Sequence, residues 1–322
     1  MTLPVLDVTQ TTPAELLAAF REHGAVLASD PVVPASRCDT MLADVAALFA
    51  QPAAAKAALA IERSPHFRGH SRMHNERDHR EQFHFGRERA AVAAPEAAPH
   101  WRLQGPNPWP VDAARAARVR NYSAMVEQVG VRLLAKLAHA LELDSAVWLG
   151  DDPYLLAKAI AYHPQPHAHA ERRGVAAHLD FSLLTLTLQD DVGGLATRRP
   201  DGTWAPVPTP RGAWLVNVGE LLQYVTGNRL VATPHRVVNP STRRTRCSVP
   251  VFVNPSLTTV LHRHAAPWPA AAEADEHVHA VLAVDAPPAT LAFGPAEWRR
   301  KGENVWCAAC VGTSATAPPR RG

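Results

Sequence analysis

The segment between residues 155 and 253 constrains the fold most, because it divides into many short apolar runs separated by turn residues. Residues 193–194 and 200–202 carry the glycine, proline and aspartate that mark turns, so we expect a hairpin over 198–207. After Ser182 the chain alternates leucine with threonine, a period of two that predicts a β-strand. Eight or so short strands at this spacing favour a double-stranded β-helix (jelly roll) in an α+β protein with a mainly β core.

His178 and Asp180 stand two residues apart in this segment. On a strand, such residues point to the same side, so we expect an imidazole and a carboxylate to converge. Two such groups are two thirds of the 2-His-1-carboxylate triad that holds non-haem Fe(II). The pair alone is a weak signal, because the chain has 17 histidines and His-x-acid recurs at 74–76 and 169–171, where surface pairs are the simpler interpretation.

Two downstream features distinguish His178 and Asp180 from the other pairs. His235 could supply a third ligand, because a jelly roll brings distant strands into contact. Arg246 and Ser248 open another β-rich run and are again two residues apart, so they should face one way and could hold a carboxylate. The planar fork of arginine suits that role, because it matches a carboxylate bidentately.

In this order and spacing, the five residues resemble the Fe(II)/2-oxoglutarate dioxygenases of the isopenicillin-N-synthase-like superfamily. The connecting segments 188–195, 216–223 and 233–238 are similar to that family as well. Segments 67–70, 80–86 and 105–110 resemble its N-terminal region. The resemblance implies the jelly roll, packed against N-terminal helices and one long backing helix.

The resemblance also implies the cofactors. His178, Asp180 and His235 would bind Fe(II), and the remaining positions would take 2-oxoglutarate and O2. Arg246 and Ser248 would bind the far carboxylate of 2-oxoglutarate, and Tyr162 matches a family tyrosine that could donate its hydroxyl to the same ligand. The sequence departs from many relatives at a nearby position, where residue 160 is isoleucine and not asparagine.

The implied reaction oxidises a C–H bond of a small molecule by hydroxylation, desaturation or ring closure, while 2-oxoglutarate becomes succinate and CO2. Asp180 favours these outcomes over halogenation, because related halogenases lack the carboxylate. Two other functions stay open. One is a 2-oxoglutarate-independent Fe(II) oxidase or cyclase like isopenicillin N synthase, in which Arg246 holds a substrate carboxylate. The other is a non-catalytic β-barrel that binds a ligand.

Bulk properties narrow the class of protein. A net charge of +3 over 322 residues argues against nucleic acid as the main partner. Four cysteines in such a chain do not suggest a disulfide scaffold. The start lacks a basic region followed by an apolar stretch, and no run of about 18 apolar residues predicts a membrane span. We therefore expect a cytoplasmic, monomeric enzyme with a small-molecule substrate.

We expect one structural domain with four regions. Residues 1–110 form an N-terminal region with helices at 14–23 and 34–49, the first capped by Thr12 with Glu15. Its second half, 62–110, is expected to be irregular and to face the substrate. Residues 111–150 hold the backing helix, and 151–256 form the jelly-roll core with a short helix at 220–224.

Residues 257–322 form the C-terminal segment and tail. We expect a strand at 278–284, a helix at 295–301 and disorder at 313–322. Cys307 and Cys310 form a Cys-x-x-Cys, but neither a thioredoxin-like context nor further zinc ligands are visible, so we interpret the two thiols as incidental.

Overall fold

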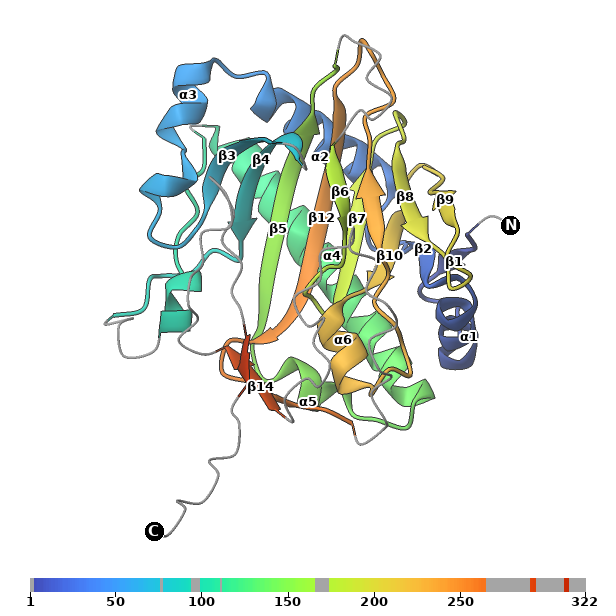
Figure 1. Cartoon of the computed structure of the whole chain (residues 1–322). Coiled ribbons are helices and arrows are strands. Elements are labelled where there is room, and N and C mark those ends of the chain that lie inside the picture. Colours follow the sequence, from blue (N-terminus) through green and yellow to red (C-terminus); the bar gives the residue numbers. More distant parts are fainter. Residues whose placement is uncertain are drawn as a thin grey trace, which may run out of the picture.

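The computed structural model describes residues 3–75, 78–93, 99–110, 112–165, 174–264, 290–293 and 310–312. Its largest feature is an eight-stranded sheet in the order β1-β2-β10-β7-β12-β5-β4-β3 (Figure 1). The β1–β2 pair is parallel, and the other neighbouring pairs are antiparallel. The strands are β1 (Val5–Asp7), β2 (Ala25–Ser29), β3 (Gly69–His74), β4 (His79–Gly86), β5 (Pro153–Tyr162), β7 (Leu184–Gln189), β10 (Trp214–Val218) and β12 (Arg246–Ser256).

A second, four-stranded sheet has the order β6-β11-β8-β9, and the two sheets are not closed into one barrel. Its strands are β6 (Val175–His178), β8 (Leu195–Arg198), β9 (Trp204–Pro206) and β11 (His235–Val237). The β8–β9 pairing confirms the hairpin predicted over 198–207. A third sheet joins β13 (Val260–His262), β14 (Thr290–Phe293) and β15 (Cys310–Gly312).

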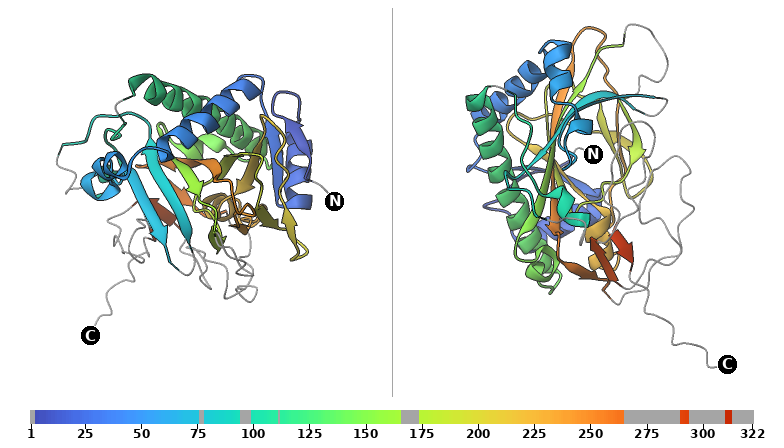
Figure 2. Two further views of the ribbon diagram at one scale, coloured as in Figure 1. Left: turned by 90° about the horizontal axis from the view of Figure 1, so that it is seen from above. Right: turned by 90° about the vertical axis from the view of Figure 1, so that its left-hand side faces the viewer.

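Helices cover one face of the larger sheet, and the second sheet lies on the other side (Figure 2). Both α2 and α4 contact β12, while α1 packs on α4. The helices are α1 (Pro13–His23), α2 (Ala35–Phe49), α3 (Ala53–Ala58), α4 (Ala113–Ala140), α5 (Ser145–Leu149) and α6 (Glu220–Val225), with 3-10 turns η1 (Ile61–Arg63) and η3 (Pro99–Leu103). None of the described helices is long and apolar enough to cross a membrane.

Local sequence signals explain the ends of these helices. Thr12 and Glu15 form the predicted capping box at the start of α1, and Gly24 ends that helix with a left-handed φ of 74°. The side chain of Asp112 accepts a hydrogen bond from the backbone N–H of Arg115 and so caps α4. The predicted backing helix is therefore confirmed as α4, and the short helix α5 occupies the end of the predicted range.

The alternation of leucine and threonine in β7 sorts side chains between two cores. Leu184, Leu186 and Leu188 belong to the large core between the sheet and the helices. Because alternate residues of a strand face opposite sides, Thr185 and Thr187 face the second sheet. A smaller core lies on that side and includes Ile160, Tyr162, Val175, Leu195 and Val237.

The prediction of an irregular segment over 62–110 is wrong for its first half. Strands β3 and β4 form a hairpin, and β4 pairs with β5, so the hairpin extends the larger sheet. The histidines and arginines of this stretch concealed the alternation of Gln82 and His84 with Phe83 and Phe85, which belong to the large core.

A buried ion cluster fastens this hairpin to its neighbours. The Glu81 carboxylate accepts hydrogen bonds from Lys56 Nζ at 2.7 Å, His70 Nε2 at 2.8 Å and His163 Nε2 at 2.8 Å. Burial acts to raise the pKa of Glu81, but the three donors outweigh it and lower that pKa. The cluster thus joins α3, β3, β4 and the end of β5.

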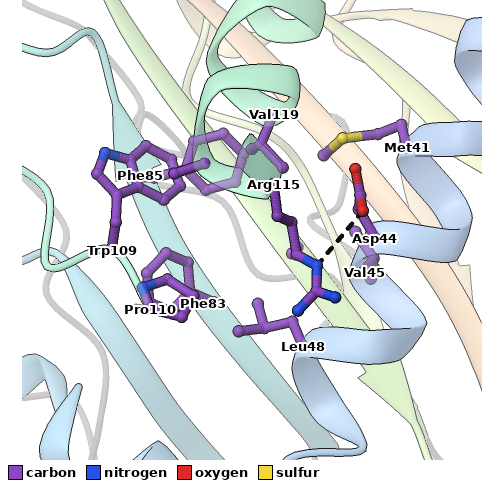
Figure 3. A pocket seen from close by; sticks show the side chains of 12 residues that line it. Met41, Asp44, Val45, Leu48, Phe83, Phe85, Trp109, Pro110, Arg115 and Val119 are labelled. Atoms are coloured by element: carbon purple, nitrogen blue, oxygen red, sulfur yellow. Dashed lines mark hydrogen bonds and ion pairs between the residues drawn. The ribbon is translucent and has the colours of Figure 1, made fainter. Parts of the chain in front are cut away.

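Trp109 packs on the helix side of β4. Its ring lies 6.0 Å from that of Phe83 and 5.5 Å from that of Phe85, between centroids. These three rings line a pocket beside α2 and α4, where Arg115 contacts Asp44 (Figure 3). The pocket therefore lies on the helix face of the sheet, opposite the face that meets the second sheet.

The remaining predictions of the C-terminal segment cannot be compared with the structure. The strand at 278–284, the helix at 295–301, the tail at 313–322 and Cys307 lie outside the described residues. The division into four regions also stays a prediction.

Candidate metal centre

The second sheet brings His178 and His235 together. His178 is the last residue of β6, and His235 is the first residue of β11. The two are directly opposite each other in the antiparallel β6–β11 pair, and their ring centroids are 4.2 Å apart. Strand pairing therefore joins two histidines that are 57 positions apart in the numbering, as expected for a jelly roll.

Asp180 completes the group, but not for the predicted reason. Strand β6 ends at His178, so Asp180 lies in the turn that follows and not on the same strand. Its backbone carbonyl accepts a hydrogen bond from the N–H of Glu220, which holds the turn against the start of α6. The Asp180 carboxylate lies 3.8 Å from His178 Nε2 and 3.6 Å from His235 Nε2.

The backbone fixes which ring nitrogen each histidine presents. His178 Nδ1 lies 2.9 Å from the carbonyl oxygen of Ala176, and His235 Nδ1 lies 3.1 Å from that of Thr233. Since a carbonyl can only accept, each Nδ1 must carry the proton and donate. Each Nε2 is then left with a lone pair, the arrangement usual for metal-binding histidines.

The three ligand atoms from His178, Asp180 and His235 all lie within 4.8 Å of one another. Elsewhere among the described residues no comparable group of His, Cys, Asp or Glu occurs.

Burial sets the charges of this group. It lowers the pKa of His178 to about 3, with a further contribution from His235, so the imidazole is neutral near pH 7. For Asp180, burial acts in the opposite direction, but His235, His178 and Asn217 outweigh it and lower the pKa. A neutral His178 imidazole beside an ionised Asp180 carboxylate is the protonation state that a divalent cation requires of these two ligands.

Strand β12 places Arg246 on the face of the larger sheet that meets the second sheet, called the inner face from here on. It is fully buried (0% exposed) and directly opposite Tyr162 of β5, with its guanidinium carbon 4.9 Å from the Tyr162 ring centroid. Its Nε donates to the carbonyl oxygen of Gly193 at 2.6 Å, and its Nη2 donates to Gln189 Oε1 at 2.9 Å. Its Nη1 is buried without a hydrogen-bond partner.

Ser248 shares this face with Arg246, because the two are separated by one residue of β12. It is buried and lies opposite Ile160 on one side and Gln189 on the other. The predicted juxtaposition of Arg246, Ser248 and Tyr162 therefore occurs. An orphaned, buried N–H on a cation is the feature that a ligand carboxylate would satisfy, so these residues fit 2-oxoglutarate.

Asn217 has a role that was not predicted from the sequence. This residue of β10 is buried and donates from Nδ2 to Asp180 Oδ2 at 2.9 Å, which orients the carboxylate. A signal was present, because Asn217 is the polar residue in the otherwise apolar strand Trp214–Val218. Gln189, which supports Arg246, ends β7 in a similar way.

Two family models match the chain. Residues 152–255 match the 2OG-Fe(II) oxygenase superfamily, and residues 3–112 match the N-terminal region described as non-haem dioxygenase in morphine synthesis. A 2-oxoglutarate-dependent dioxygenase of Gibberella zeae is 30% identical over 290 residues, covering 80% of this chain and 76% of that protein. The 2-oxoglutarate-Fe(II) type oxidoreductase hxnY of Emericella nidulans is 34% identical over 157 residues, but the match spans 46% of this chain and only 45% of that relative.

Solved structures agree with the larger architecture. The rice dioxygenase for auxin oxidation is 25% identical, with a TM-score of 0.63, over 82% of this chain and 86% of that one. A Neurospora crassa protein in complex with alpha-KG and thymine is 19% identical, with a TM-score of 0.69, over 82% of this chain and 88% of that one. These likenesses confirm the predicted jelly roll. Together with the match to the Gibberella zeae protein, they show that the chain belongs to the 2OG-Fe(II) oxygenase superfamily.

Proposed function

We propose that this protein is an Fe(II)- and 2-oxoglutarate-dependent oxygenase that oxidises a C–H bond of a small molecule. The observation that carries the proposal is the convergence of His178, Asp180 and His235 on the inner face that also holds Arg246, whose Nη1 is buried without a partner. The first three would bind Fe(II), and Arg246 would bind the far carboxylate of 2-oxoglutarate.

Each side chain has a distinct task in this proposal. The two histidines present Nε2, because their Nδ1 atoms are engaged by the backbone. Asp180 supplies the negative charge, and Asn217 holds one of its oxygens. Bound iron, 2-oxoglutarate and O2 would supply the oxidising power for C–H cleavage, with release of succinate and CO2.

The cosubstrate end depends on Arg246, Ser248 and Tyr162. Gly193 and Gln189 fix the guanidinium, so binding of a carboxylate requires little further ordering of the arginine. Ser248 and Tyr162 lie beside it as candidate hydroxyl donors. Ile160 offers no polar atom, so the contact that asparagine makes in many relatives is absent from our proposal.

We propose that the substrate is a small molecule and not a nucleic acid, in keeping with the near-neutral charge of the chain. We also propose that the protein acts as a cytoplasmic monomer. Hydroxylation, desaturation and ring closure are all compatible with a triad that includes Asp180.

One experiment tests the oxygenase proposal. The anaerobic Fe(II) protein should develop a metal-to-ligand charge-transfer band when 2-oxoglutarate is added, and should form succinate slowly once O2 is admitted. Asp180→Ala, which lacks one ligand, is the matched control and should show neither signal. No band and no succinate with the unmutated protein would contradict the proposal. O2-dependent oxidation of a substrate without 2-oxoglutarate would favour the oxidase alternative, and ligand binding without any turnover would favour the non-catalytic one.

A further inference from the structure

Arg68 is a second buried arginine whose charge has no counterion among the described residues. It is 2% exposed and directly precedes β3. Its Nη2 donates to the carbonyl oxygen of Leu103 at 3.0 Å, but its Nε and Nη1 are buried without a hydrogen-bond partner. Within the part of the chain that the structure describes, no carboxylate forms an ion pair with it. Nε and Nη1 belong to different edges of the guanidinium, so each edge keeps an N–H to donate.

The guanidinium lies on the inner face of the larger sheet. A Cβ added to Gly86 would fall 2.4 Å from Arg68 Nη2, so the group lies directly over that glycine. Gly86 is opposite Leu156 in β5, and paired residues face the same side. That side is the inner one, because the adjacent residues Phe85 and Ala157 point the other way, into the large core between the sheet and the helices.

One row of paired residues links this position to the metal centre. The row runs across five strands through Asn217, Thr185, Phe252, Leu156 and Gly86. Asn217, at one end, holds the carboxylate of Asp180, and Gly86, at the other, carries the Arg68 guanidinium. Four strand spacings of about 4.8 Å separate the ends by about 19 Å along the sheet, and curvature shortens the direct path.

His84 adds a second unsatisfied group to the same face. It is two residues before Gly86, is 5% exposed, and has a buried Nε2 without a hydrogen-bond partner. It lies opposite Lys158, whose Nζ is 5.1 Å from the Phe252 ring centroid. Burial, followed by the charges of Lys158, Arg80 and Arg68, holds the pKa of His84 well below its usual range.

The charged groups that act on the pKa of His84 are thus all cationic. A buried guanidinium without a counterion is costly, and it is stabilised when an anion supplies the missing charge and hydrogen bonds. Arginine is well suited to this, because its fork matches a carboxylate or phosphate.

We propose that Arg68 and His84 form a binding site for an anionic group of the substrate, a carboxylate in the first instance. The inference rests on the proposed oxygenase function, and it adds the class of substrate. The anion is held by Arg68, directly before β3, and by His84 of β4, several strands away from the metal centre. The oxidised carbon is therefore separated from the anionic group by several bonds. Oxidation at the α-carbon of a short acid is excluded.

The test compares acids with their uncharged amides. Protein loaded anaerobically with Fe(II) and saturating 2-oxoglutarate is titrated calorimetrically with matched pairs, from 3-phenylpropionate and 3-phenylpropionamide to dodecanoate and dodecanamide. At least one acid should bind on the order of tenfold or more tightly than its amide, because a charge-assisted pair replaces a neutral contact. Equal binding within every pair, or no acid that binds, would overturn the proposal.

Arg68→Met should abolish the preference for acids. If that variant fails to fold, variants of His84 still test the proposal. His84→Glu places a carboxylate beside Arg68 and should abolish the preference for acids. His84→Gln introduces a side chain of the same length as glutamate but without its charge, and should keep the preference. Arg211→Met removes an exposed arginine paired with Asp39 and is the control for loss of a positive charge. An acid preference that persists in His84→Glu would refute the assignment.

The same samples separate this proposal from the proposed function. Absence of the 2-oxoglutarate charge-transfer band in the unmutated protein would count against the oxygenase function. A normal band with no acid preference would count against the anion site alone.

Discussion

Replacing Arg246 by methionine should weaken 2-oxoglutarate binding by about 10- to 100-fold. The Nη1 group is buried and has no partner, so a carboxylate bound there gains at least one charge-assisted hydrogen bond. Hydrogen bonds to charged groups are worth roughly 1.5–3 kcal/mol, and about 1.4 kcal/mol corresponds to a tenfold change in affinity. A ligand carboxylate left in the site without its cation would weaken binding further.

The same substitution affects the fold through two opposing effects. It leaves the Gly193 carbonyl and Gln189 Oε1 without their donor, at roughly 1–3 kcal/mol for each buried group. It also removes a buried cation that forms no ion pair with any described carboxylate, which is favourable. We therefore expect a change of about 2 kcal/mol or less in the free energy of unfolding. Arg246→Lys should retain part of the affinity, because the charge remains while the fork is lost.

The assay is an anaerobic titration of 2-oxoglutarate into the Fe(II) protein, followed by the charge-transfer band. Fe(II) affinity, measured separately, should change little, because Arg246 is not among the proposed ligands. Arg244→Met is the matched control, since Arg244 stands two positions before Arg246 but is exposed and paired with Asp191. A titration curve for Arg246→Met that superimposes on that of the unmutated protein would show that 2-oxoglutarate does not use this guanidinium.

Three further predictions concern other parts of the molecule. Asn217→Ala should weaken Fe(II) binding about 10- to 100-fold by releasing Asp180, as loss of an outer partner of a metal ligand typically does, and unchanged Fe(II) affinity would contradict this positioning role. Glu81→Gln should lower the free energy of unfolding, measured with denaturant, by about 3 kcal/mol near pH 7, because it breaks a buried ion cluster. Since the folded-state pKa of Glu81 is lowered, this contribution is present above the unfolded pKa of about 4.3 and declines as pH falls towards the folded value; a difference from Glu81→Gln that does not shrink below about pH 4 would contradict that account. The double variant Cys307→Ser, Cys310→Ser should keep activity and bound iron, and loss of either would show that the thiols are not incidental.

The jelly roll and the convergence of the candidate ligands could be predicted because the strands have local sequence patterns and the ligands are spaced as in a known family. The alternation after Ser182 indicates a strand, and the order and spacing of His178, Asp180 and His235 resemble that family. Placing Asp180 on the strand was wrong, since β6 ends at His178. The two side chains still converge because a backbone hydrogen bond from Glu220 fixes the turn, and no local pattern at residues 178–180 shows that contact.

The features that could not be predicted depend on partners far away in the sequence. Strand β4 owes its place to pairing with β5, about 75 residues later, and its charged residues disguised its alternation. Asn217 and Gln189 act through the side chains they meet across the sheet, so their roles appear only when the register is known. Arg68 lies in a family-like segment of the sequence, but the fact that no described carboxylate pairs with it is a property of the packed structure.

The two faces of the larger sheet explain why the functional residues are confined to one set of alternating positions. In β12, Cys247, Val249, Val251 and Val253 belong to the core beneath the helices, so every substitution there changes packing first. Arg246 and Ser248 occupy the other set, which faces the second sheet and its two histidines. The helix face of β12 can therefore be wholly apolar and supply cohesion, while its inner face carries the buried polar groups of Arg246 and Ser248, with Nη1 of Arg246 unsatisfied. A shift of β12 by one residue would exchange the two sets and bury Arg246 against the helices, and it is opposed by the same leucine and valine rows that the sequence displays. The pattern that fixes the strand register thus also fixes the position of the arginine relative to the candidate iron ligands.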